Sequence, residues 1–197
     1  MLLKPDQLLT RTFKSFLAAM LLVCAPLCFA GVQGWAVHYY GSAGFWYHAG
    51  ETEIAGSDLA VDLNNVKWPA QNWDAAKGPL FVRSGGWSVA AYANLKLEKP
   101  GDFRFSLEPQ KGHFGIYLLQ INGCLYDDAD LKNPIALPAG ELPIAVFVKP
   151  SENATNPDMN RIKLCLLWQA PGMAKLEPVP ASAITHEPTD AQRVKIL

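Results

Sequence analysis

Hydrophobic and polar residues alternate strictly in the middle of the chain. Over residues 103–107 every second position is apolar and the positions between are polar. A period of two places one set of side chains on a core and the other in water, so this segment predicts a half-buried strand. Residues 116–121 are apolar on both faces and predict a fully buried strand. Asn122 and Gly123 follow, and both tolerate the positive φ that a two-residue hairpin turn needs.

Similar apolar runs, bounded by turn-forming residues, occur on both sides of this hairpin. They predict strands at 31–40, 54–60, 87–97, 131–137, 142–149 and 161–169. No helical stripe occurs beyond residue 30. Many short strands separated by turn signals favour an all-β fold, a single antiparallel β-sandwich spanning 31–184. The polar residues 185–197 are expected to form a tail.

The first thirty residues have the pattern of an export signal. Three basic residues precede an apolar run at 16–27, and a small-x-small motif closes the segment at 28–30. This predicts a signal helix at 1–30 that is cleaved after export, and hence a secreted or periplasmic protein. The apolar run is short for a membrane span. Cleavage is preferred over lipidation at Cys24 or Cys28, because neither cysteine follows the small residue that lipidation favours.

Composition narrows the class of protein. The chain has 197 residues, of which 50% are hydrophobic, and a formal net charge of −1. These values suit one globular domain with a sizeable core. Without a basic excess there is no surface to follow a phosphate backbone, so we expect no nucleic-acid partner.

Two cysteines, Cys124 and Cys165, remain after removal of the signal segment. Leftover cysteines usually pair in an oxidising compartment, so a Cys124–Cys165 disulfide is predicted. The alternative is two buried free thiols on separate strands.

Five short motifs together resemble a known family. They are G-W-A-V-H-Y-Y at 34–40, W-S-V at 87–89, G-D-F-R-F-S-L at 101–107, Q-I-N-G at 120–123 and P-V-P-A-S-A-I at 178–184. In this order they resemble domains of the protective-antigen fourteen-kilodalton type. The resemblance implies a β-sandwich that is a non-catalytic module, binding sugars or mediating protein contacts.

The resemblance also raises the question of whether this chain has a calcium-binding site. Lectin-like members of that family hold Ca²⁺ with two adjacent aspartates in the loop after the G-D-Y-x-F strand. Here the matching loop, 108–112, has no such pair, and Lys111 puts a positive charge where the ion would sit. A divalent oxygen site needs 6–8 oxygen ligands with enough negative charge, so we expect no calcium and no other metal or cofactor.

Several polar residues nevertheless suit ligand binding. Asp127 and Asp128, after the hairpin, could replace the missing pair, although acidic residues after a strand are more often solvated turn residues. The loop 150–160 offers amides and an acid for hydroxyl recognition, unless it is only a connection built from turn formers. The candidate ligand-binding residues are Lys111, Asp127, Asp128, Asn153, Asn156 and Asp158.

No motif specifies catalysis. The four histidines, His38, His48, His113 and His186, lie far apart in the sequence, and none belongs to a catalytic motif. We therefore expect an exported, non-catalytic binding module that recognises an extracellular glycan or a partner protein. The alternative is a structural or assembly subunit of an envelope or surface complex that binds no sugar.

Overall fold

The computed structural model divides the chain into two compact units, residues 1–30 and 31–197. The structure describes only parts of the second unit: residues 31–41, 44–45, 48–63, 73–74, 78–79, 87–109, 115–150 and 161–187. The predicted signal helix therefore lies outside the described residues.

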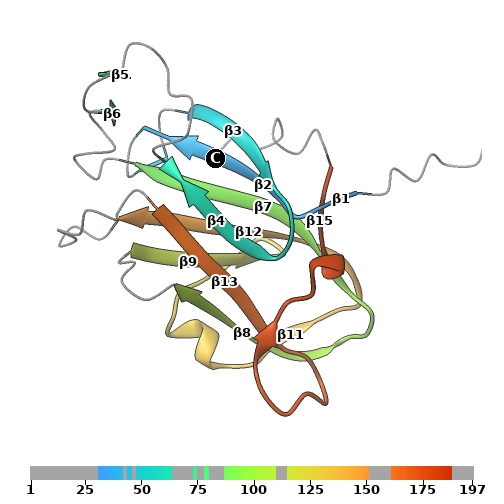
Figure 1. Ribbon diagram of the computed structural model, residues 1–197. Coiled ribbons are helices and arrows are strands. Elements are labelled where there is room, and N and C mark those ends of the chain that lie inside the picture. The colour runs from blue at the N-terminus through green and yellow to red at the C-terminus, as the bar shows by residue number, and fades with distance from the viewer. Residues whose placement is uncertain are drawn as a thin grey trace, which may run out of the picture. The chain divides into compact units, whose positions relative to one another are not determined.

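Two antiparallel sheets, packed face to face, make up most of the described residues (Figure 1). The larger sheet contains eight strands: β1 (Val32–Gln33), β2 (Trp35–Tyr40), β3 (His48–Ile54), β7 (Ser88–Leu97), β9 (Gly115–Ile121), β10 (Cys124–Tyr126), β12 (Gly140–Pro150) and β15 (Ile184–His186). The smaller sheet contains five: β4 (Asp58–Asp62), β8 (Gly101–Pro109), β11 (Ile135–Leu137), β13 (Arg161–Gln169) and β14 (Glu177–Pro178). The remaining described elements are β5 (Trp73–Asp74), β6 (Gly78–Pro79) and the 3₁₀ turns η3 (Asp130–Lys132) and η5 (Ala181–Ala183).

Strand β7 is the central strand of the larger sheet. One edge pairs with β12, from Leu97 opposite Gly140 to Val89 opposite Val148. The other edge is shared by β2, opposite the first half of β7, and β15, opposite Leu95. Because β2 also pairs with β3, a hairpin extends the sheet beside the start of β7.

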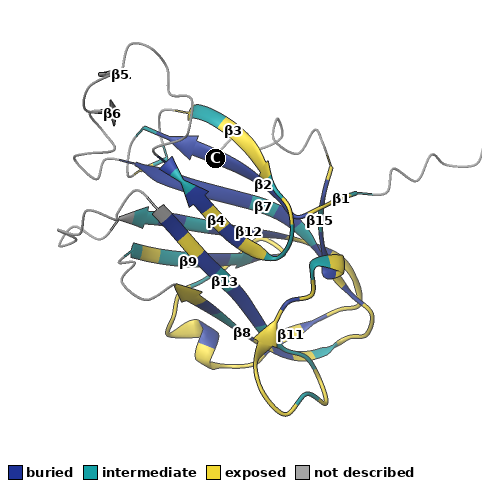
Figure 2. Ribbon diagram, in the orientation of Figure 1, coloured by how far each residue is buried: buried dark blue, intermediate teal, exposed yellow. Residues whose placement is uncertain are grey.

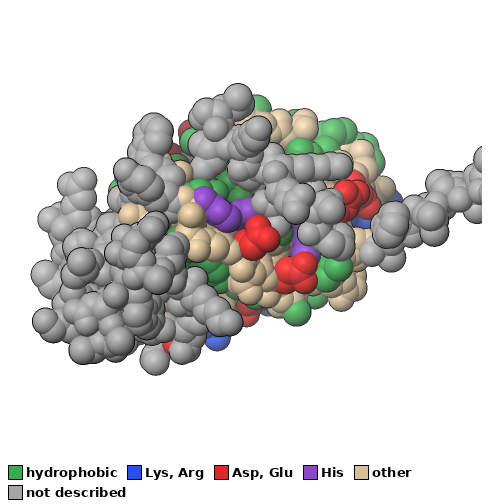
Figure 3. Space-filling model, turned by 90° about the horizontal axis from the view of Figure 1, so that it is seen from above, with side chains coloured by type: hydrophobic (Ala, Val, Ile, Leu, Met, Phe, Trp, Pro, Cys, Tyr) green, Lys and Arg blue, Asp and Glu red, His purple; other side chains and the backbone are tan. Residues whose placement is uncertain are grey.

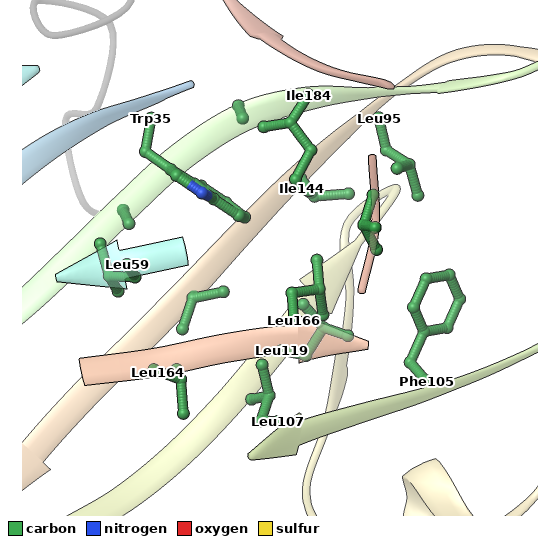
Figure 4. Packing of buried hydrophobic residues seen from close by; sticks show 14 of the residues in the cluster. Trp35, Leu59, Leu95, Phe105, Leu107, Leu119, Ile144, Leu164, Leu166 and Ile184 are labelled. Carbon is green, nitrogen blue, oxygen red and sulfur yellow. The ribbon is translucent and has the colours of Figure 1, made fainter. Parts of the chain in front are cut away.

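The sandwich core follows from the period of two. Alternate residues of the facing strands point into the space between the sheets (Figure 4). Trp35, Leu119, Ile144, Leu164 and Ile184 are each at most 3% exposed. Burial of aliphatic and aromatic side chains of this size is the main favourable term in folding.

Most of the predicted strands are confirmed. Strands β7, β12 and β13 lie at 87–97, 142–149 and 161–169 to within two residues, and the fold is the predicted β-sandwich. The hairpin turn is confirmed as well, since φ is 49° at Asn122 and 84° at Gly123.

Other boundaries were wrong. The segment 54–60, predicted as one strand, contains the last residue of β3 and the first three of β4, separated by a turn at 55–57 in which Gly56 has a φ of 88°. In the segment 131–137, residues 131 and 132 belong to η3, and the strand is β11, an edge strand that begins after Pro134. Residues 185 and 186, assigned to the tail, belong to β15, where His186 is 1% exposed. Local turn signals alone did not show which polar residues tertiary packing would bury.

One glycine positions the β2–β3 hairpin. Gly34 has a φ of 122°, and a Cβ built on it would lie 2.0 Å from the carbonyl oxygen of Ile54. Only a residue without a side chain allows the two backbones to come this close. No helix among the described residues is long and apolar enough to cross a membrane.

Candidate functional site

The face of the larger sheet that points away from the core carries an unexpected buried cluster. Along β2, Trp35, Val37 and Tyr39 enter the core, so the intervening His38 and Tyr40 point to the opposite face. Both are nevertheless buried, with exposed fractions of 2% and 3%. Figure 2 shows the whole of β2 as buried. We define the outer-face cluster as His38, Tyr40, Phe45, His48, Tyr92 and Phe147.

Ring contacts hold the outer-face cluster together. Phe45 packs edge-on against Tyr40 and Phe147, with ring centroids 5.6 and 5.5 Å apart. Tyr92 packs edge-on against Phe147 at 5.9 Å and against His38 at 5.6 Å. Edge-to-face pairs at these distances are attractive beyond the area that they bury. The cluster therefore joins side chains from β2, β3, β7 and β12 to Phe45, which precedes β3.

Phe45 reaches this position through an uncommon backbone conformation. Its φ is 62°, in the left-handed region that a bulky residue rarely occupies. Such a conformation costs on the order of 1–3 kcal/mol and persists only where the surroundings enforce it. Its contacts with Tyr40 and Phe147 are the interactions that offset this cost.

Two histidines and a glutamate meet at the exposed side of the outer-face cluster. The Nδ1 atom of His38 lies 2.9 Å from the Nε2 atom of His48. Glu51 pairs directly with His38 across the β2–β3 ladder. One potential ligand atom from each of the three residues lies within 4.8 Å of the other two. In Figure 3 histidine side chains lie beside acidic ones on the face seen from above.

The environment keeps His38 neutral. Burial lowers its pKa, the neighbouring His48 lowers the pKa further, and Glu51 opposes both effects. The Nε2 atom of His38 is buried and has no hydrogen-bond partner among the described residues. An unpaired buried polar atom costs about 1–3 kcal/mol. Among the described residues, the His38 ring therefore forms a hydrogen bond only through its Nδ1 atom.

The tyrosines of the outer-face cluster also remain protonated. Burial raises the pKa of Tyr92, and the nearby Tyr40 raises it further. Burial likewise raises the pKa of Tyr40. The side chains of Tyr40 and Tyr92, which lie beside His38, are therefore uncharged at physiological pH.

A second feature, which we call the end pocket, lies at the other end of β7. Tyr40 pairs with Ser88 at the start of that strand, whereas the end pocket is lined by residues at its close. The cavity volume is about 620 Å³. The lining residues are Lys96, Leu97, Glu98, Lys99, Pro100, Phe103, Trp168, Ala170, Pro171, Pro180, Ser182 and Ala183.

Trp168 and Phe103 form the aromatic part of the end pocket. Their ring centroids lie 6.0 Å apart with planes tilted by 34°. Trp168 is only half-buried and leaves part of its ring open to the cavity. Lys96, Glu98 and Ser182 are exposed and put charged and hydroxyl groups on the rim.

Of the predicted ligand-binding residues, only Asp127 and Asp128 are described. The Oδ1 atom of Asp127 accepts hydrogen bonds from the backbone N–H groups of Ala129, at 2.8 Å, and Asp130, at 3.0 Å. These bonds hold the pKa of Asp127 below its ordinary value. Asp127 thus closes the turn before η3, while Asp128 is exposed in that turn. Lys111, Asn153, Asn156 and Asp158 lie outside the described residues.

The predicted disulfide is not formed. Cys124 and Cys165 are free thiols in the structure. Cys124 lies in the larger sheet, whereas Cys165 lies in the smaller sheet, between two core residues of β13. Alternation therefore turns Cys165 outward, to a face where Asp58 and Glu108 are its cross-strand neighbours. Burial, together with Asp58, raises the pKa of the Cys165 thiol to about 11.

Sequence reasoning missed both the histidine–glutamate group and the end pocket. His38 and His48 were set aside because they are ten residues apart. The useful signal was that antiparallel pairing of residues 35–40 with 48–54 would place His38 beside Glu51 and His48 on the same face. The end pocket has no such local signal, since its lining comes from four separate segments.

Comparisons with known proteins show a likeness of fold. No family model and no curated protein matches this chain. An anti-sigma factor domain-containing protein has a similar structure, with a TM-score of 0.54 and 18% identity over 83% of this chain and 51% of that one. The transport component C2-II of the C2-toxin from Clostridium botulinum has a TM-score of 0.54 and 13% identity, over 80% of this chain and 28% of the toxin chain.

A third similar structure has a lower TM-score. The PA14 domain of the MpAFP antifreeze protein has a TM-score of 0.47 and 12% identity, over 79% of this chain and 92% of that one. The present chain covers about half or less of the two chains with the higher TM-scores. At these identities the comparisons show the fold alone.

Proposed function

We propose that this chain is an exported, non-catalytic binding module that takes an extracellular glycan in the end pocket. The observation that carries the proposal is the open ring of Trp168 beside Phe103 in a cavity of about 620 Å³. Ligand sites in proteins are typically clefts of about 300–1,000 Å³ with apolar walls and a few polar groups.

The chemistry of the lining supports a sugar as ligand. A sugar ring has an apolar C–H face, which packs on an aromatic ring, and a rim of hydroxyl groups. Trp168 offers the aromatic surface, with the buried Phe103 packed beside it, and Lys96, Glu98 and Ser182 offer hydrogen-bond donors and acceptors on the rim. These groups come from chain segments anchored in both sheets, so the site needs little ordering before it binds.

Membership of the protective-antigen fourteen-kilodalton type family is part of the proposal. The five sequence motifs support it, and the β-sandwich is the fold that the resemblance implied. The absence of catalysis is proposed on the same basis, together with the absence of a catalytic sequence motif.

A glycan array probed with the purified chain tests the proposal. We expect reproducible binding to a restricted set of glycans, and the Trp168→Ala variant should bind at least about tenfold more weakly, since 1.4 kcal/mol of lost stacking and burial corresponds to a factor of ten. The control is Tyr126→Ala, which removes a half-buried ring from β10, away from the end pocket. It should leave binding unchanged.

The rival function is a structural or assembly subunit of an envelope complex. A blank array, with envelope proteins co-purifying equally with the parent chain and Trp168→Ala, would favour that rival. Equal losses of glycan binding in Trp168→Ala and Tyr126→Ala would remove the end pocket as the site.

A further inference from the structure

The histidine–glutamate group has a chemistry that the end pocket does not share. His38, His48 and Glu51 bring two imidazole nitrogens and a carboxylate to one place on the outer face of the larger sheet. We infer that these three residues bind a divalent transition-metal ion of the zinc class. This site is independent of glycan binding in the end pocket.

The donor set selects the class of ion. Imidazole nitrogens combined with one carboxylate suit Zn²⁺ and similar borderline ions, and the same combination occurs in zinc sites with three protein ligands. Calcium and magnesium instead favour sites built from oxygen ligands. Three protein ligands leave a fourth tetrahedral position for water or another donor.

The distances are close to those that a metal requires. At metal–nitrogen distances of about 2.0–2.1 Å, two ligands of a tetrahedral ion lie about 3.3 Å apart. The two histidine nitrogens are 2.9 Å apart, and all three ligand atoms lie within 4.8 Å. His48 and Glu51 are exposed and can rotate by the small amount needed, while His38 is fixed by burial.

Strand pairing prearranges the three ligands. Glu51 faces His38 across the β2–β3 ladder, and His48 faces Tyr40, one side-chain step along the same face. A bulge between Tyr39 and Tyr40 shifts the register at that step. Ligands fixed by a sheet lose little freedom when an ion binds, which favours affinity.

A hydrogen bond between the two histidines does not account for the whole arrangement. The Nε2 atom of His38 is buried without a partner among the described residues, so the ring loses one of its two hydrogen bonds by lying here. The rings of Tyr92 and Tyr40 lie close to it, with centroids 5.6 and 6.5 Å from that of His38. The result is a buried imidazole whose Nδ1 atom faces the Nε2 atom of His48, with the carboxylate of Glu51 within reach of the same place.

Isothermal titration calorimetry with Zn²⁺ tests the inference directly. The protein is the full chain without an affinity tag, with all four cysteines changed to serine so that no thiol binds zinc. We expect about one zinc per chain and a rise in Tm of several degrees at a hundredfold excess over Kd, because a ligand that binds only the native state stabilises it. Co²⁺ should give the visible absorption of a four-coordinate site.

Substitutions at the two exposed ligands provide the decisive comparison. His48→Gln and Glu51→Gln should each weaken zinc binding at least about tenfold, since each removes a direct ligand. The matched control is Glu53→Gln, which removes the same charge from the same strand outside the group. It should leave affinity within about twofold.

Three results would overturn the inference. They are the absence of a zinc-dependent heat or Tm change at millimolar zinc, unchanged affinity in His48→Gln, or an equal loss in Glu53→Gln and Glu51→Gln. Circular dichroism of each variant checks that it is folded. Glycan binding by the end pocket should be the same with zinc and with a chelator, so failure of one proposal leaves the other standing.

Discussion

The sandwich core and the outer-face cluster are built from alternate residues of the same strands, yet they differ in chemistry. Along β7 the inward residues Val89 and Leu95 are aliphatic, whereas the outward Tyr92 carries a hydroxyl group. Along β2 the outward residue is His38, which is as fully buried as its core neighbours. One face of the sheet is held by non-directional burial, and the other by ring edges and polar atoms at defined distances.

The comparison shows which part of the larger sheet depends on the exact identity of its side chains. A hydrophobic core tolerates substitution of one apolar side chain by another, provided that the total volume is conserved. In the outer-face cluster each ring meets a neighbour in a particular orientation, and the buried His38 has a single hydrogen-bond partner among the described residues. The core therefore contributes mainly to the stability of the fold, while the outer-face cluster fixes the relative positions of particular side chains.

The largest effect is expected from a cavity in the core. Leu119 in β9 is 0% exposed, so Leu119→Ala should reduce the free energy of unfolding by about 3 kcal/mol through lost burial and an unfilled cavity. Urea unfolding measures the change. Leu125→Ala in β10, where the leucine is 52% exposed, should cost less than about 0.5 kcal/mol. If the two losses were equal, the inner face would not be the dominant core.

A substitution at Gly34 should affect both regions. Gly34→Ala places a methyl group against the Ile54 carbonyl in a backbone conformation unfavourable to alanine, so we expect a loss of at least about 2 kcal/mol. Gly56→Ala, at a φ of 88° but in open space, should cost only about 1 kcal/mol. Thermal unfolding ranks the two variants. Equal losses would mean that the contact with Ile54 does not position the β2–β3 hairpin.

The smallest effect concerns the outer face of the smaller sheet, which lacks a described aromatic cluster. With its pKa raised to about 11, the Cys165 thiol is almost fully protonated at pH 8 and should alkylate roughly tenfold more slowly than free cysteine. The rate should rise as pH increases towards 11, since the thiolate is the reactive form. Mass spectrometry of the Cys165 peptide measures this rate. Asp58→Asn should accelerate the reaction at pH 8, and an unchanged rate would contradict the effect assigned to that carboxylate.

Particular residues show how far sequence patterns could be followed. The alternation at 103–107 predicted β8 because its apolar residues all face one core, and Asn122 with Gly123 predicted the hairpin because few other residues adopt positive φ. The turn at Gly56 was missed because the apolar residues on its two sides suggested one continuous strand. The predicted disulfide failed because alternation in β13 turns Cys165 away from the core.

The candidate sites were less accessible to sequence reasoning than the fold. Trp168 lies in a predicted strand, but only the structure shows that its position at the end of β13 leaves the ring open to the end pocket. Asp127 was proposed as a ligand, and its carboxylate instead accepts two backbone hydrogen bonds in a turn. His38, His48 and Glu51 had no motif that joined them.

The sequence by itself determined the all-β class, the inward face of the main strands and the hairpin at Asn122, since each depends on neighbours within a few residues. Tertiary structure alone decided that the outward His38 is buried, that Glu51 lies beside it and that Trp168 opens into a pocket. These features depend on the register between strands and on segments distant along the chain. A period of two gives every strand two faces, and the packing of the whole domain decides what covers each of them.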